Sequence, residues 1–131
     1  MKFIGKYGEH AVMLNLLKLN IEAYLAIKSN QEDYDITVVI NNSNVKRIQV
    51  KSTILQNKNT NNSIDGTEKK YDYLAILIRD NEKDRFFVLS KADADAERGS
   101  NAKLGVSKLI DKESFVKDNL IQYENLWSKI A

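Results

Sequence analysis

Two runs rich in β-branched residues, separated by four small polar residues, constrain the fold of this chain most strongly. The runs cover residues 35–40 and 45–52, and Asn41, Asn42, Ser43 and Asn44 lie between them. Asparagine tolerates the left-handed backbone of tight turns, so this pattern predicts a β-hairpin. The hairpin then decides which side chains of both runs share a face.

Pairing of apolar residues selects the register of this hairpin. If Ile40 lay opposite Val45, apolar residues would face polar ones along both strands. With Ile40 opposite Lys46, one face matches apolar residues, in the pairs Val38–Ile48 and Ile36–Val50. The pairs on the other face are then Asp35–Lys51 and Thr37–Gln49. This register predicts a polar cluster of Asp35, Gln49 and Lys51, because residues two apart on a strand point the same way.

Further periodic segments complete the order of elements. Apolar spacings of three and four predict a helix over 7–28, and a nearly continuous apolar run predicts a central strand over 71–79. The expected elements after it are a strand over 85–89, a short helix over 90–98 ended by Gly99, an edge strand over 103–107 and a helix over 112–130. The polar segment 53–70 is expected to be a long loop. The prediction is an α/β fold with a central mixed sheet of four or five strands, flanked by an N-terminal and a C-terminal helix.

Composition excludes several classes of site. The chain has 131 residues and shows no internal repeat, which predicts one domain over 1–131. It has no cysteine and one histidine, so thiolate chemistry and any site that needs two histidines are excluded. No segment is apolar enough to span a bilayer, and the N-terminal residues do not resemble a secretory signal. We therefore expect a soluble, cytoplasmic protein.

Positive charge gathers in the middle of the chain. The net charge is only +2, but residues 44–70 hold six basic and two acidic side chains. We expect contacts to nucleic-acid phosphates from five of these basic residues, namely Lys46, Arg47, Lys58, Lys69 and Lys70. Tyr71 and Tyr73 follow the last two, and could stack on bases or only anchor a strand. The alternative for each lysine is an ordinary solvated loop charge.

Four residues carry the chemistry that the sequence suggests. They are Glu9 on the first helix and Asp35, Gln49 and Lys51 on the hairpin. An aspartate binds hard divalent cations such as Mg²⁺ or Mn²⁺, and a glutamine oxygen is a weaker ligand. Such a cation polarises a phosphoryl oxygen and activates water, and a nearby lysine can orient that water and stabilise developing negative charge. The combination suits the hydrolysis of a phosphodiester.

These residues resemble the PD-(D/E)XK nuclease superfamily. The resemblance rests on Gly8-Glu9, on Asp35, and on the phrase Arg47-Ile48-Gln49-Val50-Lys51-Ser52-Thr53, which is similar to the Q-x-K variant of small homing-endonuclease-like and resolvase-like members. It implies a restriction-endonuclease-like core and metal-dependent cleavage of duplex or branched DNA. In that pattern Asp35 and Gln49, with Glu9, hold the cation and Lys51 assists catalysis. The chain departs from it at Tyr34, where proline is common, and at Gln49, where a carboxylate is usual.

Two functions from different classes follow from this reading. In the first, the chain is a metal-dependent endonuclease, and cutting both strands of a duplex favours a homodimer or higher oligomer. In the second, it is a catalytically inactive DNA-binding or assembly module that keeps the nuclease fold. Each residue also has an ordinary explanation, such as a cross-strand ion pair between Asp35 and Lys51 or a Glu9 that only favours the helix start. Convergence of the four side chains in space would separate these readings.

Overall fold

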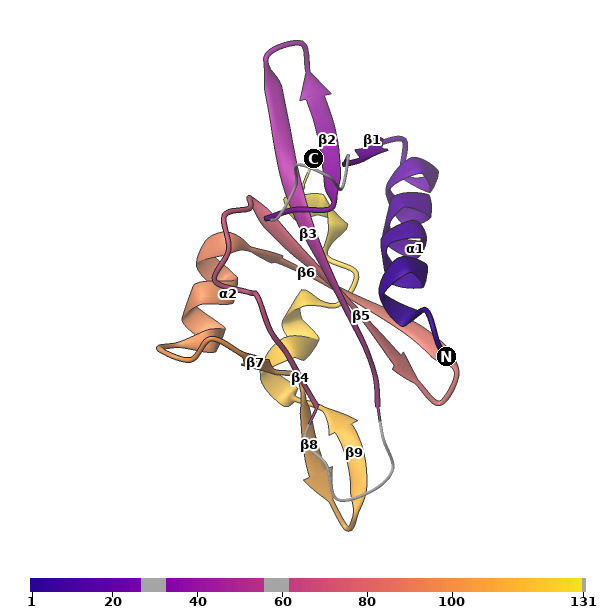
Figure 1. Ribbon diagram of the computed structural model, residues 1–131, viewed down its shortest axis with the longest axis vertical. Coiled ribbons are helices and arrows are strands. Elements are labelled where there is room, and N and C mark those ends of the chain that lie inside the picture. Colours follow the sequence, from indigo (N-terminus) through magenta and orange to yellow (C-terminus); the bar gives the residue numbers. More distant parts are fainter. Residues whose placement is uncertain (27–32, 56–61, 131) are drawn as a thin grey trace.

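A five-stranded mixed sheet forms the centre of the molecule in a computed structural model that describes residues 1–26, 33–55 and 62–130. Its strand order is β1-β2-β3-β5-β6, with bounds Glu22–Leu25, Ile36–Asn41, Asn44–Ile54, Tyr73–Asp80 and Lys83–Ser90. The pair β3–β5 is parallel and the other neighbours are antiparallel. Helix α1 (Ile4–Lys18) and helix α2 (Lys91–Arg98) lie on either side of β3 in Figure 1. The predicted fold class is confirmed.

The remaining elements are short and follow β3 in the chain. Strand β4 (Ser63–Ile64) pairs with β7 (Leu104–Gly105), and β8 (Ser107–Ile110) pairs with β9 (Glu113–Val116). Two 3₁₀ helices follow, η2 (Asp118–Tyr123) and η3 (Trp127–Lys129). Ile64, Leu104, Val116 and Leu120 of these elements pack in the apolar layer on the sheet face opposite α1, whereas Trp127 of η3 packs in the layer of α1.

The sheet separates two apolar layers. Val12 and Leu16 of α1 pack with Ile36, Ile48 and Val50 in one layer. The other layer contains the alternate residues of β5 and β6 with side chains from α2, β7 and η2, including Leu74, Ile76, Ile78, Phe87, Leu89, Ala94, Leu104 and Leu120. Five successive residues of β5 are buried because both faces of this strand are covered.

The C-terminal segment passes around the β6 edge of the sheet. Leu120 belongs to the apolar layer of α2, whereas Trp127 belongs to that of α1. Between them Glu124 bridges Phe87 of β6, and the Asn125 N–H donates to the Phe86 carbonyl. These bonds cover backbone groups at the outer edge of β6, which an exposed edge strand would present to other chains.

The helix predicted over 7–28 is wrong at its C-terminal end. Helix α1 stops at Lys18, Asn20 takes a φ of 61°, and the Ile21 N–H donates back to the Leu16 carbonyl. This left-handed residue reverses the chain, so residues 22–25 form edge strand β1 instead. The last two residues of the predicted helix lie outside the described part of the chain.

The predicted hairpin is present, with a register that differs by two residues. Ile36 pairs with Ile48 and Val38 pairs with Lys46, rather than with Val50 and Ile48. A shift of two residues keeps every side chain on its predicted face, because the side-chain period of a strand is two. The polar face of Asp35, Gln49 and Lys51 therefore survives the correction.

Three other boundaries also change. Strand β3 continues to Ile54 and residues 63–64 form β4, so the predicted loop over 53–70 is partly strand, and residues 56–61 lie outside the described part. The strand predicted over 103–107 is β7, which pairs with β4 and not with the central sheet. The continuous helix predicted over 112–130 is wrong, because residues 113–116 form β9 and only short 3₁₀ helices follow. The predicted strands over 71–79 and 85–89 and the helix ended by Gly99 are confirmed.

Candidate active site

Asp35 and Gln49 meet at the start of β2, beside the middle strand of the sheet. Both residues are buried, with 8% and 6% of their surface exposed. The Gln49 amide nitrogen lies 3.3 Å from Asp35 Oδ2, and the Val50 N–H donates to the same oxygen at 2.8 Å. The Asp35 N–H in turn donates to the Ile48 carbonyl. Asp35 is thus fixed by its own backbone and by its carboxylate against the edge of β3.

The Gln49 side chain leaves one strong acceptor unused. Its carbonyl oxygen Oε1 is buried and has no hydrogen-bond partner among the described residues. A buried amide oxygen without a partner is costly, and such an atom often contacts a bound ion or water. Since amide and carboxylate oxygens are ligands of hard divalent cations, this pair fits a Mg²⁺ or Mn²⁺ ion.

Lys51 lies further along the same face of β3. Gln49 and Lys51 are opposite Leu74 and Ile76 of the parallel neighbour β5, on the side of the sheet away from α1. The Lys51 Nζ atom is 3.5 Å from Asp65 Oδ1, and 23% of the Lys51 side chain is exposed. The structure therefore brings Lys51 onto the predicted face but pairs it with Asp65, a residue outside the predicted site.

Glu9 belongs to the other layer of the molecule. It lies half-buried on α1, next to Gly8, which packs against Ser52 and Leu77. Successive helical residues are about 100° apart, so Glu9 and Tyr7 lie on opposite flanks of Gly8. The Tyr7 hydroxyl bonds to Asp84 of β6, which places Glu9 on the flank directed away from β6. A role for Glu9 at the site of Asp35 stays a prediction.

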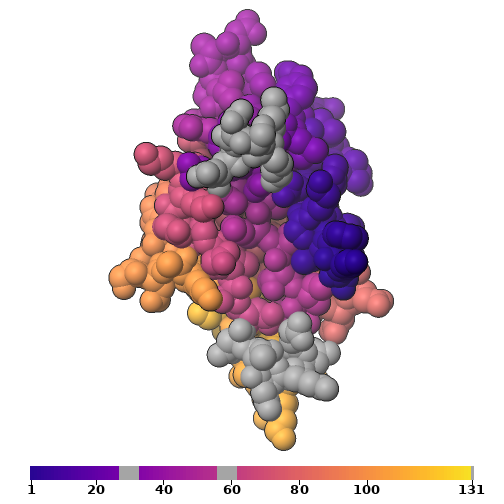
Figure 2. Space-filling view, in the orientation of Figure 1, coloured from indigo at the N-terminus to yellow at the C-terminus, as the bar shows by residue number. Residues whose placement is uncertain are grey.

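A small polar pocket opens beside Lys51. It has a volume of about 170 Å³ and is lined by Lys51, Ser52, Ser63, Ile64, Asp65 and Lys103. Lys103 reaches this pocket because β7 pairs with β4, with Leu104 opposite Ile64. No sequence signal pointed to Lys103, which is far from Lys51 along the chain. In Figure 2 the segments around β3 and β4 occupy the middle of the visible face, between α1 and α2.

The basic residues expected to contact DNA have different surroundings. Arg47 is exposed on the face of Gln49 and Lys51, pairs with Asp72 at 3.8 Å, and lies over the Tyr34 ring. Lys46 directly precedes Arg47 on β3, so its side chain points to the opposite face of the sheet. Lys70 is exposed and Lys69 half-buried, whereas Lys58 lies outside the described residues.

Tyr71 is an anchor in this structure. It is 5% exposed, and its hydroxyl donates to the Thr67 carbonyl at 2.5 Å. Burial raises the pKa of Tyr71 well above its usual value, and the charge of Asp95 raises it further. Of the two readings for this tyrosine, the structure favours the anchor over base stacking.

No protein-family model matches this chain, and no curated protein sequence does. Among solved structures, its mixed α/β architecture is similar to that of a bacterial homing endonuclease. That protein, I-Ssp6803I, superposes with a TM-score of 0.70 at 17% sequence identity, over 99% of this chain and 90% of the other. At this identity the likeness establishes a shared fold.

Acidic side chains and helix lengths in the described residues bear on the kind of site. Within residues 1–26, 33–55 and 62–130, no three His, Cys, Asp or Glu side chains form a group that could hold a metal ion. A cation near Asp35 would therefore depend on the Gln49 oxygen or on a carboxylate brought in from elsewhere. In the same described part, every helix is too short or too polar to cross a bilayer.

Proposed function

We propose that this protein is a metal-dependent endonuclease that hydrolyses DNA phosphodiester bonds and belongs to the PD-(D/E)XK superfamily. The observation that carries the proposal is the buried Asp35–Gln49 contact, with an unpartnered Gln49 oxygen and with Lys51 on the same face of β3. The similarity of the fold to that of a homing endonuclease supports it.

Each residue has a defined task in this proposal. Asp35 and Gln49 would hold a Mg²⁺ or Mn²⁺ ion through their oxygen atoms. A contribution of Glu9, which lies in the α1 layer, stays a prediction. When bound, the ion polarises the phosphate as a Lewis acid and activates water for attack. Lys51 orients the attacking water and stabilises the negative charge that develops on the phosphate. Gln49 brings no negative charge, so we expect weaker binding of the ion than in a site with two carboxylates.

The same face of the molecule would receive the DNA. Arg47 shares this face and Lys103 lines the pocket beside Lys51, so both can contact backbone phosphates near the site. One such site cuts one strand, so we propose a homodimer or higher oligomer for cleavage of a duplex.

Cleavage of supercoiled plasmid and of branched DNA with Mg²⁺ or Mn²⁺ tests the proposal. We expect nicked or linear product from the wild-type protein and none from Lys51→Ala or Asp35→Asn, with DNA binding retained. Arg47→Ala is the contrasting variant, because it should weaken binding at unchanged maximal rate. Equal cleavage by the wild type and both site variants would mean that the activity comes from elsewhere.

A second function is favoured by the polar but weakly charged site. Gln49 in place of a carboxylate is the feature expected of a DNA-binding or assembly module that has kept the nuclease fold. This module would bind DNA in a salt-sensitive way, without product and without an effect of Mg²⁺. Calorimetric detection of a Mn²⁺ site that is lost in Asp35→Asn would argue against it.

A further inference from the structure

We propose that Asp65, Gly66 and Thr67, at the start of the turn over residues 65–69, position the Lys51 ammonium group in the candidate site, with α2 as the anchor of that turn. The inference deepens the proposed function, and its catalytic consequence rests on it. Asp65 is not adjacent to Lys51 in sequence, because β3 and the turn are separated by residues 55–64. A positioning role therefore depends on how the fold holds the turn.

The first observation is the contact between Lys51 and Asp65. The two charged atoms are 3.5 Å apart, and the Asp65 side chain is 75% exposed against 23% for Lys51. A pair this exposed contributes little to stability, roughly 0–1 kcal/mol. Its effect is geometric, because a lysine side chain has four flexible bonds and needs a partner to stay in one place.

The second observation is the close approach of Gly66 to the same side chain. Gly66 has a φ of +67°, and a Cβ atom there would lie 3.0 Å from Lys51 Nζ and 3.3 Å from Lys51 Cε. Any side chain at this position would press against the ammonium group. Glycine at this position thus permits the left-handed backbone and leaves room for the Lys51 side chain to pass close to the turn.

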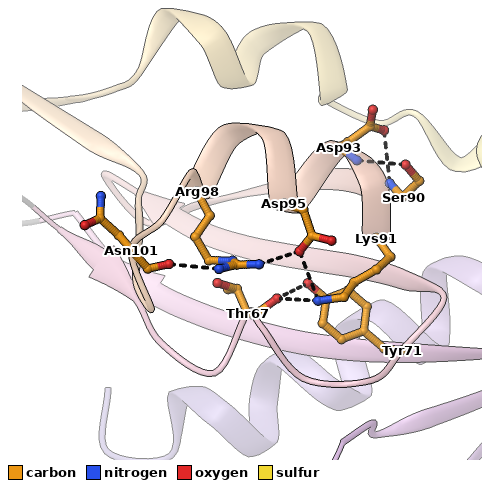
Figure 3. Close-up of polar contacts among 8 residues, drawn as sticks. All are labelled: Thr67, Tyr71, Ser90, Lys91, Asp93, Asp95, Arg98 and Asn101. Carbon is orange, nitrogen blue, oxygen red and sulfur yellow. Dashed lines mark hydrogen bonds and ion pairs between the residues drawn. The ribbon is translucent and has the colours of Figure 1, made fainter.

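The third observation is the anchoring of Thr67. This residue is fully buried, and its carbonyl accepts hydrogen bonds from the Tyr71 hydroxyl at 2.5 Å and from Lys91 Nζ at 3.3 Å. Figure 3 shows dashed lines from the Thr67 carbonyl to the Tyr71 hydroxyl and to Lys91 Nζ of α2, which lie next to each other. The turn is consequently held at its buried end, while Asp65 at its exposed end reaches Lys51.

Helix α2 is itself fixed so that it can act as this anchor. Ser90 and Asp93 form a capping box at its start, and Asp95 accepts from both Lys91 and Arg98. Lys91 also lies over the Tyr71 ring, with its Nζ atom 4.8 Å from the ring centre (Figure 3). A chain of contacts thus connects α2, through Thr67, to the group proposed to assist catalysis.

Removal of the Asp65 charge tests the positioning role. In Asp65→Asn we expect the maximal cleavage rate to fall by about tenfold or more, since small displacements of a catalytic group cost rates of this order. The KM for DNA should change little, and Asp65→Glu should restore part of the rate. Glu68→Gln is the matched control, because it removes the same charge from an exposed neighbour on the same segment. An equal effect of both variants would overturn the inference.

Alanine at two glycines separates the steric contact from backbone strain. Gly66 and Gly99 have nearly equal φ values of +67° and +65°, but the Cβ of Gly99 would meet no atom within 4 Å. Gly66→Ala and Gly99→Ala should therefore lose similar stability, and only the first should lose cleavage rate per folded molecule. Equal rates in the two variants would show that the turn does not control Lys51.

A nuclear magnetic resonance measurement keeps the inference distinct from the nuclease itself. A fixed lysine gives two separate Hε signals, whereas a freely rotating one gives an averaged signal. We expect separate signals for Lys51 in the wild type and averaged signals in Asp65→Asn but not in Glu68→Gln. Unchanged signals in Asp65→Asn would overturn the positioning role whatever the activity. Changed signals in a protein that cleaves no DNA would support positioning and overturn the proposed function alone.

Discussion

The buried amide of Gln49 donates to the carboxylate of Asp35 across 3.3 Å, while its own carbonyl oxygen has no hydrogen-bond partner among the described residues. A side chain that serves only the fold would satisfy both ends of its amide. The contact links the Asp35 carboxylate to the middle of β3 and leaves one oxygen for a ligand.

Asp35 combines a structural and a chemical task, and substitutions separate them. Asp35→Ala leaves the buried Val50 N–H without its acceptor, so we expect a loss of about 1–3 kcal/mol in the free energy of unfolding. Asp35→Asn can still accept that hydrogen bond and should lose much less stability while abolishing cleavage. Urea denaturation of both variants and a cleavage assay check this. Equal destabilisation by alanine and asparagine would mean that the side-chain bond to Val50 contributes little.

Gln49→Glu should make the fold dependent on metal. Two carboxylates in buried contact repel each other, so we expect a lower melting temperature than that of the wild type at neutral pH without divalent ions. Added Mn²⁺ should raise the melting temperature of the variant more than that of the wild type, because the ion gains a second anionic ligand. Removal of the ion with a chelator should reverse the gain. Identical shifts in both proteins would exclude an oxygen ligand at this position.

Gly8 of α1 tests the packing of the helix on β3. A Cβ there would lie 1.8 Å from Ser52 Oγ, so Gly8→Ala forces the helix and strand apart, with an expected loss of about 1–3 kcal/mol. Gly5 lies in the same helix with no atom within 4 Å of its Cβ, and Gly5→Ala should be neutral or stabilising by up to about 1 kcal/mol. Ser52→Ala should recover part of the loss in the Gly8→Ala background. Additive effects of the two substitutions would contradict a direct clash.

Acid sensitivity should arise in part at the C-terminal segment. The Arg85 guanidinium donates two hydrogen bonds to the Glu124 carboxylate, at 2.8 and 2.9 Å, and lowers the pKa of Glu124 below its usual 4.5. As the pH falls, Glu124 is therefore protonated at a higher pH in the unfolded chain than in the folded chain. The contribution of this ion pair to the free energy of unfolding is complete above pH 4.5. It declines as the pH falls through the lowered pKa of Glu124 in the folded chain.

Glu124→Gln measures this contribution. We expect the variant to be less stable than the wild type at neutral pH by about 1–2 kcal/mol, and the difference to shrink as the solution is acidified. Thermal unfolding followed across the acid range provides the test. A difference that stays constant down to strongly acidic pH would show that the pair acts through packing rather than through charge.

Most of the sheet could be predicted from the sequence because side chains alternate along a strand, and this alternation decides which residues share a face of the sheet. The face of Asp35, Gln49 and Lys51 was correct although the register was displaced by two residues. Apolar matching alone could not choose between these registers, since both keep the same residues in the core. In the observed register the Asp35 carboxylate accepts a hydrogen bond from the Val50 N–H. Every residue except proline has such a backbone donor, so the sequence could not predict this bond.

The two wrong helix boundaries share one physical cause. Asn20 and Asn125 have positive φ values inside the segments predicted as helices over 7–28 and 112–130, and Asp111 and Lys112 have positive φ values where the second segment begins. Without glycine or proline these turns give no strong signal, because asparagine, aspartate and lysine are compatible with helices. Asp65 and Lys103 could not be predicted as neighbours of Lys51, since Lys103 reaches it through the pairing of β4 with β7 and Asp65 through a segment held by hydrogen bonds to Thr67, one of them long-range.

The passage of residues 120–130 around the β6 edge has a consequence for synthesis of the protein. Leu120 and Tyr123 complete one apolar layer, and Trp127 and Ile130 complete the other. Neither layer can close while these residues are still inside the ribosome, although the hairpin and α1 have long been exposed. We therefore expect a nascent chain to hold two incomplete apolar layers until residue 130 emerges.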